Sequence, residues 1–139
     1  MVALVFAVAG CDTPKKKNPA TPARHDMRDQ SGDASFESFR GRLNKAVEMH
    51  DMQTLATMMT ADFGYQLDPP GQGDGVFQYW DQNNVWPDLQ LILSQRFAPK
   101  GNYMVAPPEF AAKPDQYKGY RAGIRIENGS WKFAYFVKD

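Results

Sequence analysis

The stretch GIRIENGSWKFAYFVKD, residues 123–139, determines how the last part of the chain folds. Asn128 and Gly129 are the preferred pair for a two-residue type I′ turn between antiparallel strands. On both sides of this pair, apolar and polar residues alternate, as they do in strands that bury one face. The sequence therefore predicts a β-hairpin centred on Asn128–Gly129.

Folding about this turn also predicts the register of the hairpin. The cross-strand pairs are Ile126 with Trp131, Ile124 with Phe133, Ala122 with Tyr135, and Tyr120 with Val137. These residues share one face, which we expect to be buried, with Trp131 as its main anchor. The opposite face carries Arg121, Arg125, Glu127 and Lys132. A solvated charged surface is the favoured interpretation of that face, and an anion clamp formed by Arg121 and Arg125 is the alternative.

Two helices and a strand are predicted before the middle of the chain. Apolar residues at spacings of three and four follow Ser35 and predict a helix of roughly 15 residues with Ser35 as its N-cap. Asp51 is expected to cap a second, shorter helix that turns Leu55, Met58 and Met59 inward. The alternation of Phe63, Tyr65 and Leu67 then predicts a strand, which the run DPPGQG at 68–73 ends.

The middle of the chain is rich in aromatic residues. A helical turn is expected after Asp74, and Pro87 suits the first residue of another helix. A strand over residues 89–93 is the alternative interpretation of that second segment. The run Tyr103–Ala106 reads as a strand that Pro107 and Pro108 end.

The order of these elements resembles the NTF2-like superfamily, which includes the SnoaL-type cyclases. The matching stretches are FRGRLNKAVEMHDMQTLATMMTAD at 39–62 and the hairpin segment from Gly123. The resemblance covers the chain from about Ser35 to its last residue. It implies an α+β fold in which a curved antiparallel sheet wraps around N-terminal helices and leaves a conical cavity. It implies a pocket without implying a particular reaction.

Five aromatic residues are candidates for lining that pocket, because they offer aromatic walls and hydroxyl groups. A packed core built from the same side chains is the alternative. The candidates are Tyr65, Trp80, Trp86, Tyr103 and Tyr135.

No catalytic residue is predicted. His25 and His50 are not placed to act as a base, and Asp62 opens the first strand, where capping or turn formation is the favoured role and catalysis the alternative. The sequence contains no nucleophile-elbow, phosphate-loop or zinc-protease motif. We expect neither a metal nor a cofactor.

The start of the chain resembles a bacterial lipoprotein signal. The eight apolar residues Val2–Ala9 suit the h-region of a secretion signal and are too few to span a bilayer, which takes about 20 residues. The lipobox-like run Val8-Ala9-Gly10-Cys11 follows, although no basic residue precedes the apolar stretch. The resemblance implies a signal peptide over residues 1–10 and lipidation of Cys11. An ordinary buried cysteine after a hydrophobic start is the alternative.

Residues 11–34 are expected to form a lipidated, disordered tether. The segment contains three prolines and one large apolar residue, so it offers too little surface to bury. The domain is then expected to occupy residues 35–139. The prediction is a protein anchored to the membrane of the bacterial cell envelope, facing the periplasm.

Composition excludes several function classes. A chain of 139 residues suits one domain, and sixteen basic residues balance sixteen acidic ones. A formal net charge of zero argues against nucleic acid as a partner. A single cysteine excludes an internal disulfide bond.

Two functions from different classes follow from the sequence. The favoured one is a non-catalytic, membrane-tethered module that binds a small ligand or an envelope protein. The alternative is a pocket isomerase, cyclase or dehydratase that acts on an apolar small molecule. A titratable group with a shifted pKa inside the pocket is the feature that discriminates between them. The sequence is compatible with a homodimer.

Overall fold

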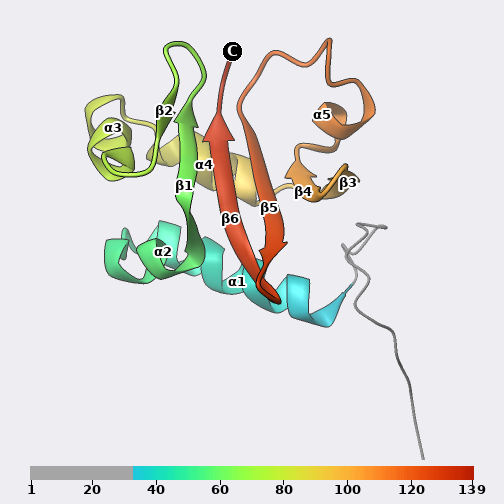
Figure 1. Ribbon diagram of the computed structural model, residues 1–139, viewed down its shortest axis with the longest axis horizontal. Helices are drawn as coiled ribbons and strands as arrows, with labels where there is room; N and C mark the ends of the chain where they lie inside the picture. The colour runs from blue at the N-terminus through green and yellow to red at the C-terminus, as the bar shows by residue number, and fades with distance from the viewer. Residues whose placement is uncertain (1–32) are drawn as a thin grey trace, which may run out of the picture.

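The described residues form one curved sheet of six strands in the order β2-β1-β6-β5-β4-β3 (Figure 1). The computed structural model describes residues 33–139. The strands are β1 (Met59–Gln66), β2 (Gly71–Gln72), β3 (Ala98–Lys100), β4 (Tyr103–Ala106), β5 (Arg121–Glu127) and β6 (Ser130–Val137). The α+β class is confirmed. The prediction of a purely antiparallel sheet is wrong, because β1 and β6 pair in parallel, whereas the other neighbouring strands pair antiparallel.

Within the described part of the chain, five helices accompany the sheet: α1 (Ala34–Glu48), α2 (Met52–Met58), α3 (Val76–Gln82), α4 (Trp86–Leu93) and α5 (Pro108–Ala112). Asp51 caps α2 as predicted, since its side chain accepts a hydrogen bond from the Thr54 backbone N–H. The expected N-cap of α1 is corrected from Ser35 to Asp33, whose carboxylate accepts from the backbone N–H groups of Ser35 and Phe36. Asp33 has extended backbone dihedral angles and its side chain reaches two N–H groups of the first turn, whereas Ser35 already lies inside the helix.

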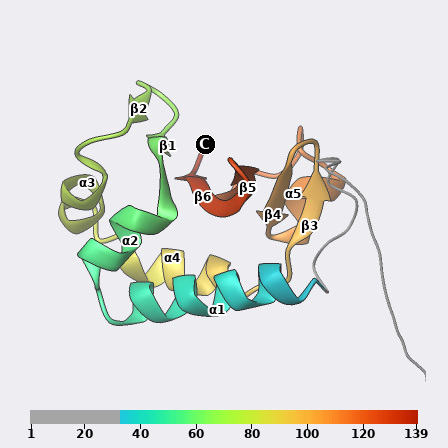
Figure 2. The same ribbon diagram turned by 60° about the horizontal axis from the view of Figure 1, so that its bottom comes forward.

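The helices α1 and α4 lie against one face of the sheet beneath the β5–β6 hairpin, as Figure 2 shows. The β1–β2 and β3–β4 ends of the sheet lie on either side of this hairpin (Figure 2). The hydrophobic core fills the space between the helices and this face. Its largest fully buried side chains include Phe36, Leu43, Phe63, Trp80, Leu89, Leu93, Met104, Ile124, Phe133 and Phe136.

The β5–β6 hairpin has the predicted turn, but its register changes halfway along. Ile126 pairs with Trp131, and Ile124 pairs with Phe133, both as predicted. Beyond Phe133 the pairing slips by one residue, so the structure pairs Gly123 with Tyr135, Ala122 with Phe136 and Arg121 with Val137. The residue left over is Ala134, at the position of a β-bulge. The predicted pairs of Ala122 with Tyr135 and Tyr120 with Val137 are therefore wrong.

Several shorter elements were not expected from the sequence. They are β2, β3 and α5, which have two, three and five residues. Segments this short have too few residues for a hydrophobic period to show. The segment after Val85 is the helix α4 with Pro87 in its first turn, and the alternative strand over residues 89–93 is not found.

The predicted signal peptide, Cys11, His25 and nearly all of the predicted tether lie outside the described residues. Within residues 33–139, no helix has the length and the apolar character needed to cross a bilayer.

Candidate ligand groove

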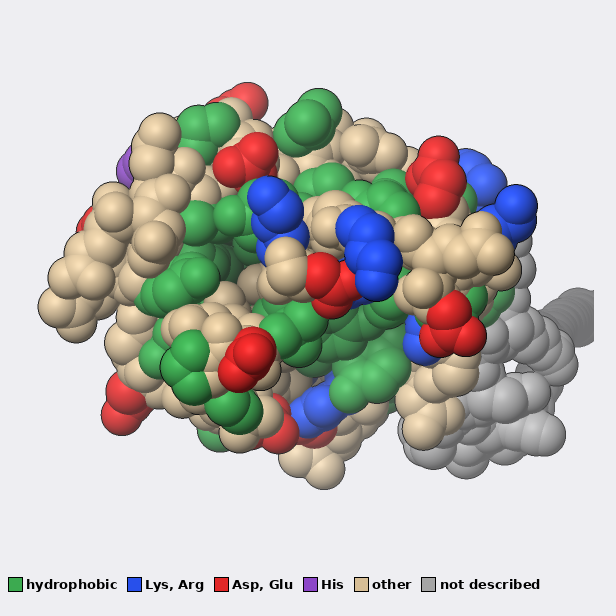
Figure 3. All heavy atoms as spheres, turned by 90° about the horizontal axis from the view of Figure 1, so that it is seen from above, with side chains coloured by type: hydrophobic (Ala, Val, Ile, Leu, Met, Phe, Trp, Pro, Cys, Tyr) green, Lys and Arg blue, Asp and Glu red, His purple; other side chains and the backbone are tan. Residues whose placement is uncertain are grey.

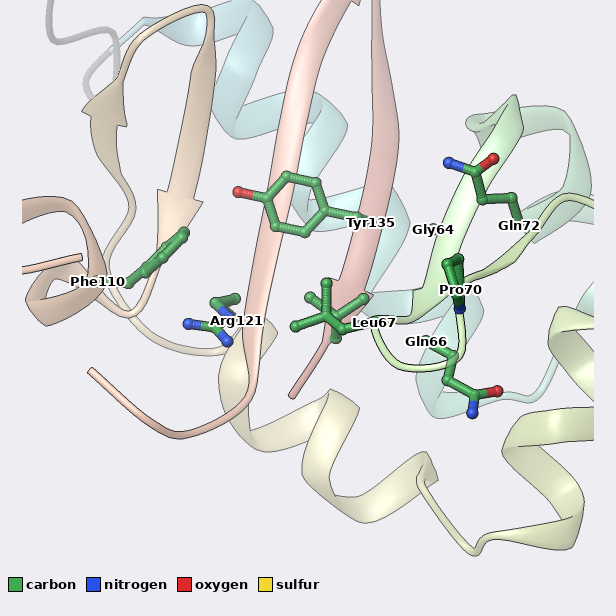
Figure 4. A pocket seen from close by; sticks show the side chains of 9 residues that line it. Gly64, Gln66, Leu67, Pro70, Gln72, Phe110, Arg121 and Tyr135 are labelled. Carbon is green, nitrogen blue, oxygen red and sulfur yellow. The ribbon is translucent and has the colours of Figure 1, made fainter. Parts of the chain in front are cut away.

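An open groove of about 450 Å³ lies on the sheet face opposite the helical core. Figure 4 shows Phe110 and Arg121 at one side of it and Pro70 and Gln72 at the other, with Tyr135 between them. The lining residues are Gly64, Gln66, Leu67, Pro70, Gln72, Phe110, Arg121, Tyr135 and Val137. The floor thus comes from β5 and β6, one wall from β1, β2 and their connection, and the other wall from α5.

The β-bulge at Ala134 creates the floor of this groove. Because one residue is inserted after Phe133, Phe136 faces the core, and Tyr135 and Val137 both line the groove. Without the bulge, Tyr135 would share the core face with Phe133, which is the arrangement that strict alternation predicts. The groove therefore depends on an irregularity in an otherwise regular hairpin.

Tyr135 lies flat over β5 because its partner there is Gly123. A Cβ atom placed on Gly123 would come within 2.9 Å of the Tyr135 Cδ2 atom and closer still to Cε2 and Cζ. On the other side, Gly64 of β1 is the residue that pairs with Tyr135. A Cβ on Gly64 would lie an ordinary 3.5 Å from the Tyr135 Cβ atom. Gly123 therefore provides the space in which the aromatic ring sits.

The Tyr135 hydroxyl group is held in its protonated form. Burial raises the pKa of Tyr135, the neighbouring Tyr103 raises it further, and the positive charge of Arg121 opposes both effects. The rings of Tyr103 and Tyr135 have their centroids 5.3 Å apart. At neutral pH, Tyr135 can donate or accept a hydrogen bond, but it does not act as an anionic base.

Arg121 is the charged residue of the groove, and it is 5% exposed. The prediction that Arg121 lies on a solvated face is therefore wrong. Its Nη2 atom donates to the Asp139 carboxylate, and its Nη1 atom lies 3.3 Å from the Tyr117 carbonyl oxygen. Its guanidinium carbon stands 4.9 Å from the centroid of the Phe110 ring. These partners compensate for the removal of the guanidinium from water.

A second polar cluster surrounds Arg125. Its guanidinium donates to the Glu127 carboxylate at 2.7 Å and to the Tyr103 hydroxyl at 3.1 Å, and it lies 3.5 Å from Asp62. The bond to Glu127 is the main reason why the pKa of Arg125 is raised. Arg121 and Arg125 have separate partners and do not form one clamp. With two carboxylates close by, Arg125 is an ion-paired surface group.

The five predicted pocket aromatics lie on both faces of the sheet. Trp80 and Trp86 belong to the helical core, with ring centroids 5.1 Å apart. Tyr65 packs against the same core and lies 5.2 Å from the Tyr79 ring. Tyr135 lines the groove, and Tyr103 packs beside it. The structure thus brings together Tyr103 and Tyr135 and separates them from the other three.

Sequence reasoning missed most of the remaining groove residues. Leu67 and Pro70 lie in the turn that follows β1, and Phe110 lies on the short helix α5. Their positions carry no periodic signal, because the wall they form depends on how distant segments fold together. The charge of Arg121 between apolar neighbours was visible in the sequence, although its burial was not.

The end of the molecule seen in Figure 3 shows hydrophobic side chains among basic and acidic ones. The other polar residues considered in the sequence lie away from the groove. His50 stacks on Trp86 with ring centroids 4.2 Å apart, and Asp62 is an exposed residue of β1. Residues 33–139 contain no group of three or more His, Cys, Asp or Glu side chains placed to hold a metal ion.

No family model matches the chain, and comparisons with curated proteins and with solved structures find no significant match.

Proposed function

We propose that this protein is a lipid-anchored module of the bacterial cell envelope whose groove binds a small, largely apolar ligand without transforming it. The observation that carries the binding function is the groove over Tyr135. Its volume falls in the range of about 300–1,000 Å³ that is typical of small-molecule sites. Leu67, Pro70, Phe110 and Val137 supply apolar walls, and Arg121 and Tyr135 supply polar groups.

The titratable groups that line the groove favour binding over proton transfer. Among the described residues, these groups are the Arg121 guanidinium, which has no acceptor atom, and the Tyr135 hydroxyl, whose pKa is raised by burial. An isomerase or dehydratase needs a group that accepts a proton near neutral pH. The described residues that line the groove include no carboxylate and no histidine, and the Asp139 carboxylate beside it is paired with Arg121.

The fold and anchoring parts of the proposal rest on the sequence. The curved sheet, the N-terminal helices and the terminal hairpin are compatible with the NTF2-like resemblance, and membership of that superfamily is part of the proposal. The run Val8-Ala9-Gly10-Cys11 after an apolar stretch supports lipidation of Cys11.

Binding can be tested with N-phenyl-1-naphthylamine, a neutral fluorescent probe whose emission rises in apolar surroundings. We expect the purified protein to bind it, and Leu67→Glu to weaken binding more than about tenfold, because a carboxylate would then border the apolar wall. Leu91→Glu on α4 is the matched control, since both leucines are exposed on the surface and only Leu67 lines the groove. Equal effects of the two variants, or no binding at all, would overturn the proposed ligand site.

Lipidation can be tested by measuring the intact mass of protein made in a bacterial host behind a complete signal. A diacyl or triacyl addition is expected on the wild type, and Cys11→Ser should carry no lipid and be either soluble or left unprocessed. An unmodified wild-type Cys11 under these conditions would refute the anchor.

A further inference from the structure

Arg121 marks one end of the groove as a site for negative charge. Arg121 is 5% exposed, and a guanidinium buried to this extent is rare unless an anion accompanies it, because the cost of removing it from water is high. Its position is fixed by the Phe110 ring at 4.9 Å and by the Tyr117 carbonyl oxygen at 3.3 Å. These two contacts orient the guanidinium, but neither neutralises its charge.

The anion that accompanies Arg121 comes from the chain itself. Asp139 follows β6 outside regular structure, and its Oδ1 atom accepts a hydrogen bond from Arg121 Nη2. Its Oδ2 atom lies 4.0 Å from Lys118 Nζ. The Asp139 side chain is 39% exposed, whereas that of Arg121 is 7% exposed. A half-exposed carboxylate is thus shared between the two cations Arg121 and Lys118.

The groove continues from Arg121 as an apolar surface. Val137 and Tyr135 form the floor beyond it, and Leu67 and Pro70 form the far wall. Figure 4 shows Arg121 beside Phe110 at one side of this surface. A molecule with a carboxylate at one end and a hydrocarbon part at the other matches this sequence of charged and apolar contacts.

We propose that the groove binds a small amphipathic carboxylate whose head group replaces the Asp139 carboxylate on Arg121. This inference rests on the proposed function and specifies its ligand class. The contact between Asp139 and Arg121 supplies the same chemistry as the incoming head group, a carboxylate oxygen that accepts from the guanidinium. Asp139 is therefore a competitor built into the chain, and it lowers the apparent affinity of the site for carboxylate ligands.

The test compares octanoate with octan-1-ol, which has the same hydrocarbon length and no charge, by isothermal titration at neutral pH. We expect the wild type to prefer octanoate. Asp139→Asn should strengthen octanoate binding about tenfold and leave octan-1-ol binding unchanged, because the variant removes the competing charge and keeps the side-chain shape. Asp62→Asn is the matched control, since it removes the same charge beside Arg125, and we expect no change in either ligand.

Arg121→Gln should abolish the preference for octanoate, with folding checked by circular dichroism. Because this buried substitution can prevent folding, Asp139→Asn tests the inference independently. Equal affinity of the wild type for the two ligands, or an Asp139→Asn variant that binds octanoate no better than wild type, overturns the inference and leaves an apolar groove standing. If neither ligand binds while N-phenyl-1-naphthylamine does, the inference is overturned and the proposed function stands; if none of the three binds the folded wild type, the proposed function itself is refuted.

Discussion

Gly123 determines, at the scale of a single residue, whether the Tyr135 ring can lie on the sheet. A methyl group there would overlap the ring, so Gly123→Ala must move Tyr135 or the strand that carries it. We expect a loss of about 1–3 kcal/mol in the free energy of unfolding, as for other overpacked sites. Gly64→Ala places its methyl group 3.5 Å from the Tyr135 Cβ atom and should cost less than about 1 kcal/mol. Urea denaturation of both variants measures the contrast, and similar losses would contradict this account of the ring.

The Tyr135 hydroxyl group should give the protein a measurable dependence on alkaline pH. Burial raises its folded-state pKa above the ordinary 10.0, so the folded state holds the proton more tightly than the unfolded state. The resulting stability is fully present below pH 10 and is lost as the pH rises toward the folded-state value. Tyr117 and Tyr120, whose pKa values are also raised, contribute in the same direction.

Tyr135→Phe isolates the contribution of this one hydroxyl group. The variant should lose less stability than the wild type between pH 9 and pH 11, because it has no proton to release at position 135. Chemical denaturation at several pH values in this range measures the difference. Identical alkaline slopes for the two proteins would show that Tyr135 is not buried in the way described.

At the scale of elements, the β5–β6 hairpin can be tested through two adjacent residues. Trp131 packs edge-on against Phe36 with ring centroids 5.0 Å apart, and its Nε1 atom donates to the Ser35 hydroxyl at 3.0 Å. Since Trp131 is only partly buried, Trp131→Ala should cost an amount near the lower end of the usual range of about 3–5 kcal/mol.

Lys132 is the matched comparison for Trp131. Its Nζ atom donates to the Thr57 carbonyl oxygen at 2.8 Å in an exposed position. Lys132→Ala should therefore change the free energy of unfolding by less than about 0.5 kcal/mol. A larger loss from Lys132→Ala than from Trp131→Ala, measured by denaturation, is incompatible with the pairing of Ile126 with Trp131.

The same hairpin shows how far sequence reasoning reaches. Asn128 and Gly129 specify the turn, and alternation specifies the pairs nearest to it. The bulge at Ala134 leaves no trace in that alternation, because Tyr135 and Phe136 are both aromatic and either could face the core. The register beyond Phe133 depends on which ring fits between the helices. Tertiary packing therefore determines the register in a segment where the alternation of residues is compatible with two registers.

The site was less predictable than the fold for the same reason. Tyr103 and Tyr135 were candidates because aromatic hydroxyl groups suit a pocket, and the structure places them side by side. Phe110 and Asp139 were not candidates, since α5 and the end of the chain carry no periodic signal. Their relation to Arg121 arises from the tertiary fold, which joins segments that are distant along the chain.

At the scale of the whole molecule, the mixed sheet is what makes the open groove. The parallel pairing of β1 with β6 brings the β1–β2 turn beside the strand that carries Tyr135. On the other side, β4 pairs with β5 and leads into α5, which supplies Phe110. Both walls thus extend from neighbours of one central hairpin, and changes that stabilise this hairpin should also stabilise the groove.

The boundary of the folded domain provides the last prediction. The composition of residues 12–30 offers almost no apolar surface, so we expect a chain that begins at Ser31 to unfold within a few degrees of one that begins at Asp12. Asp33→Ala in either chain should cost about 0.5–2 kcal/mol, because the first turn of α1 loses the carboxylate that accepts its N–H groups.

Measurements at acid pH distinguish the contribution of the Asp33 carboxylate to stability from other effects at the boundary of the domain. The hydrogen bond from the Ser35 hydroxyl is the main reason why the pKa of Asp33 is lowered. Because its folded-state pKa is lowered, the ionised Asp33 carboxylate stabilises the protein at pH values above its unfolded-state pKa of about 3.9. This stabilisation is lost as the pH falls through the folded-state pKa. The difference between Asp33→Ala and the wild type should therefore shrink on acidification, as thermal melts at neutral and acid pH can show. If the stability difference between Asp33→Ala and the wild type stays constant with pH, Asp33 stabilises α1 without using its charge. If deleting residues 12–30 lowers the melting temperature by much more than a few degrees, this segment packs on the domain.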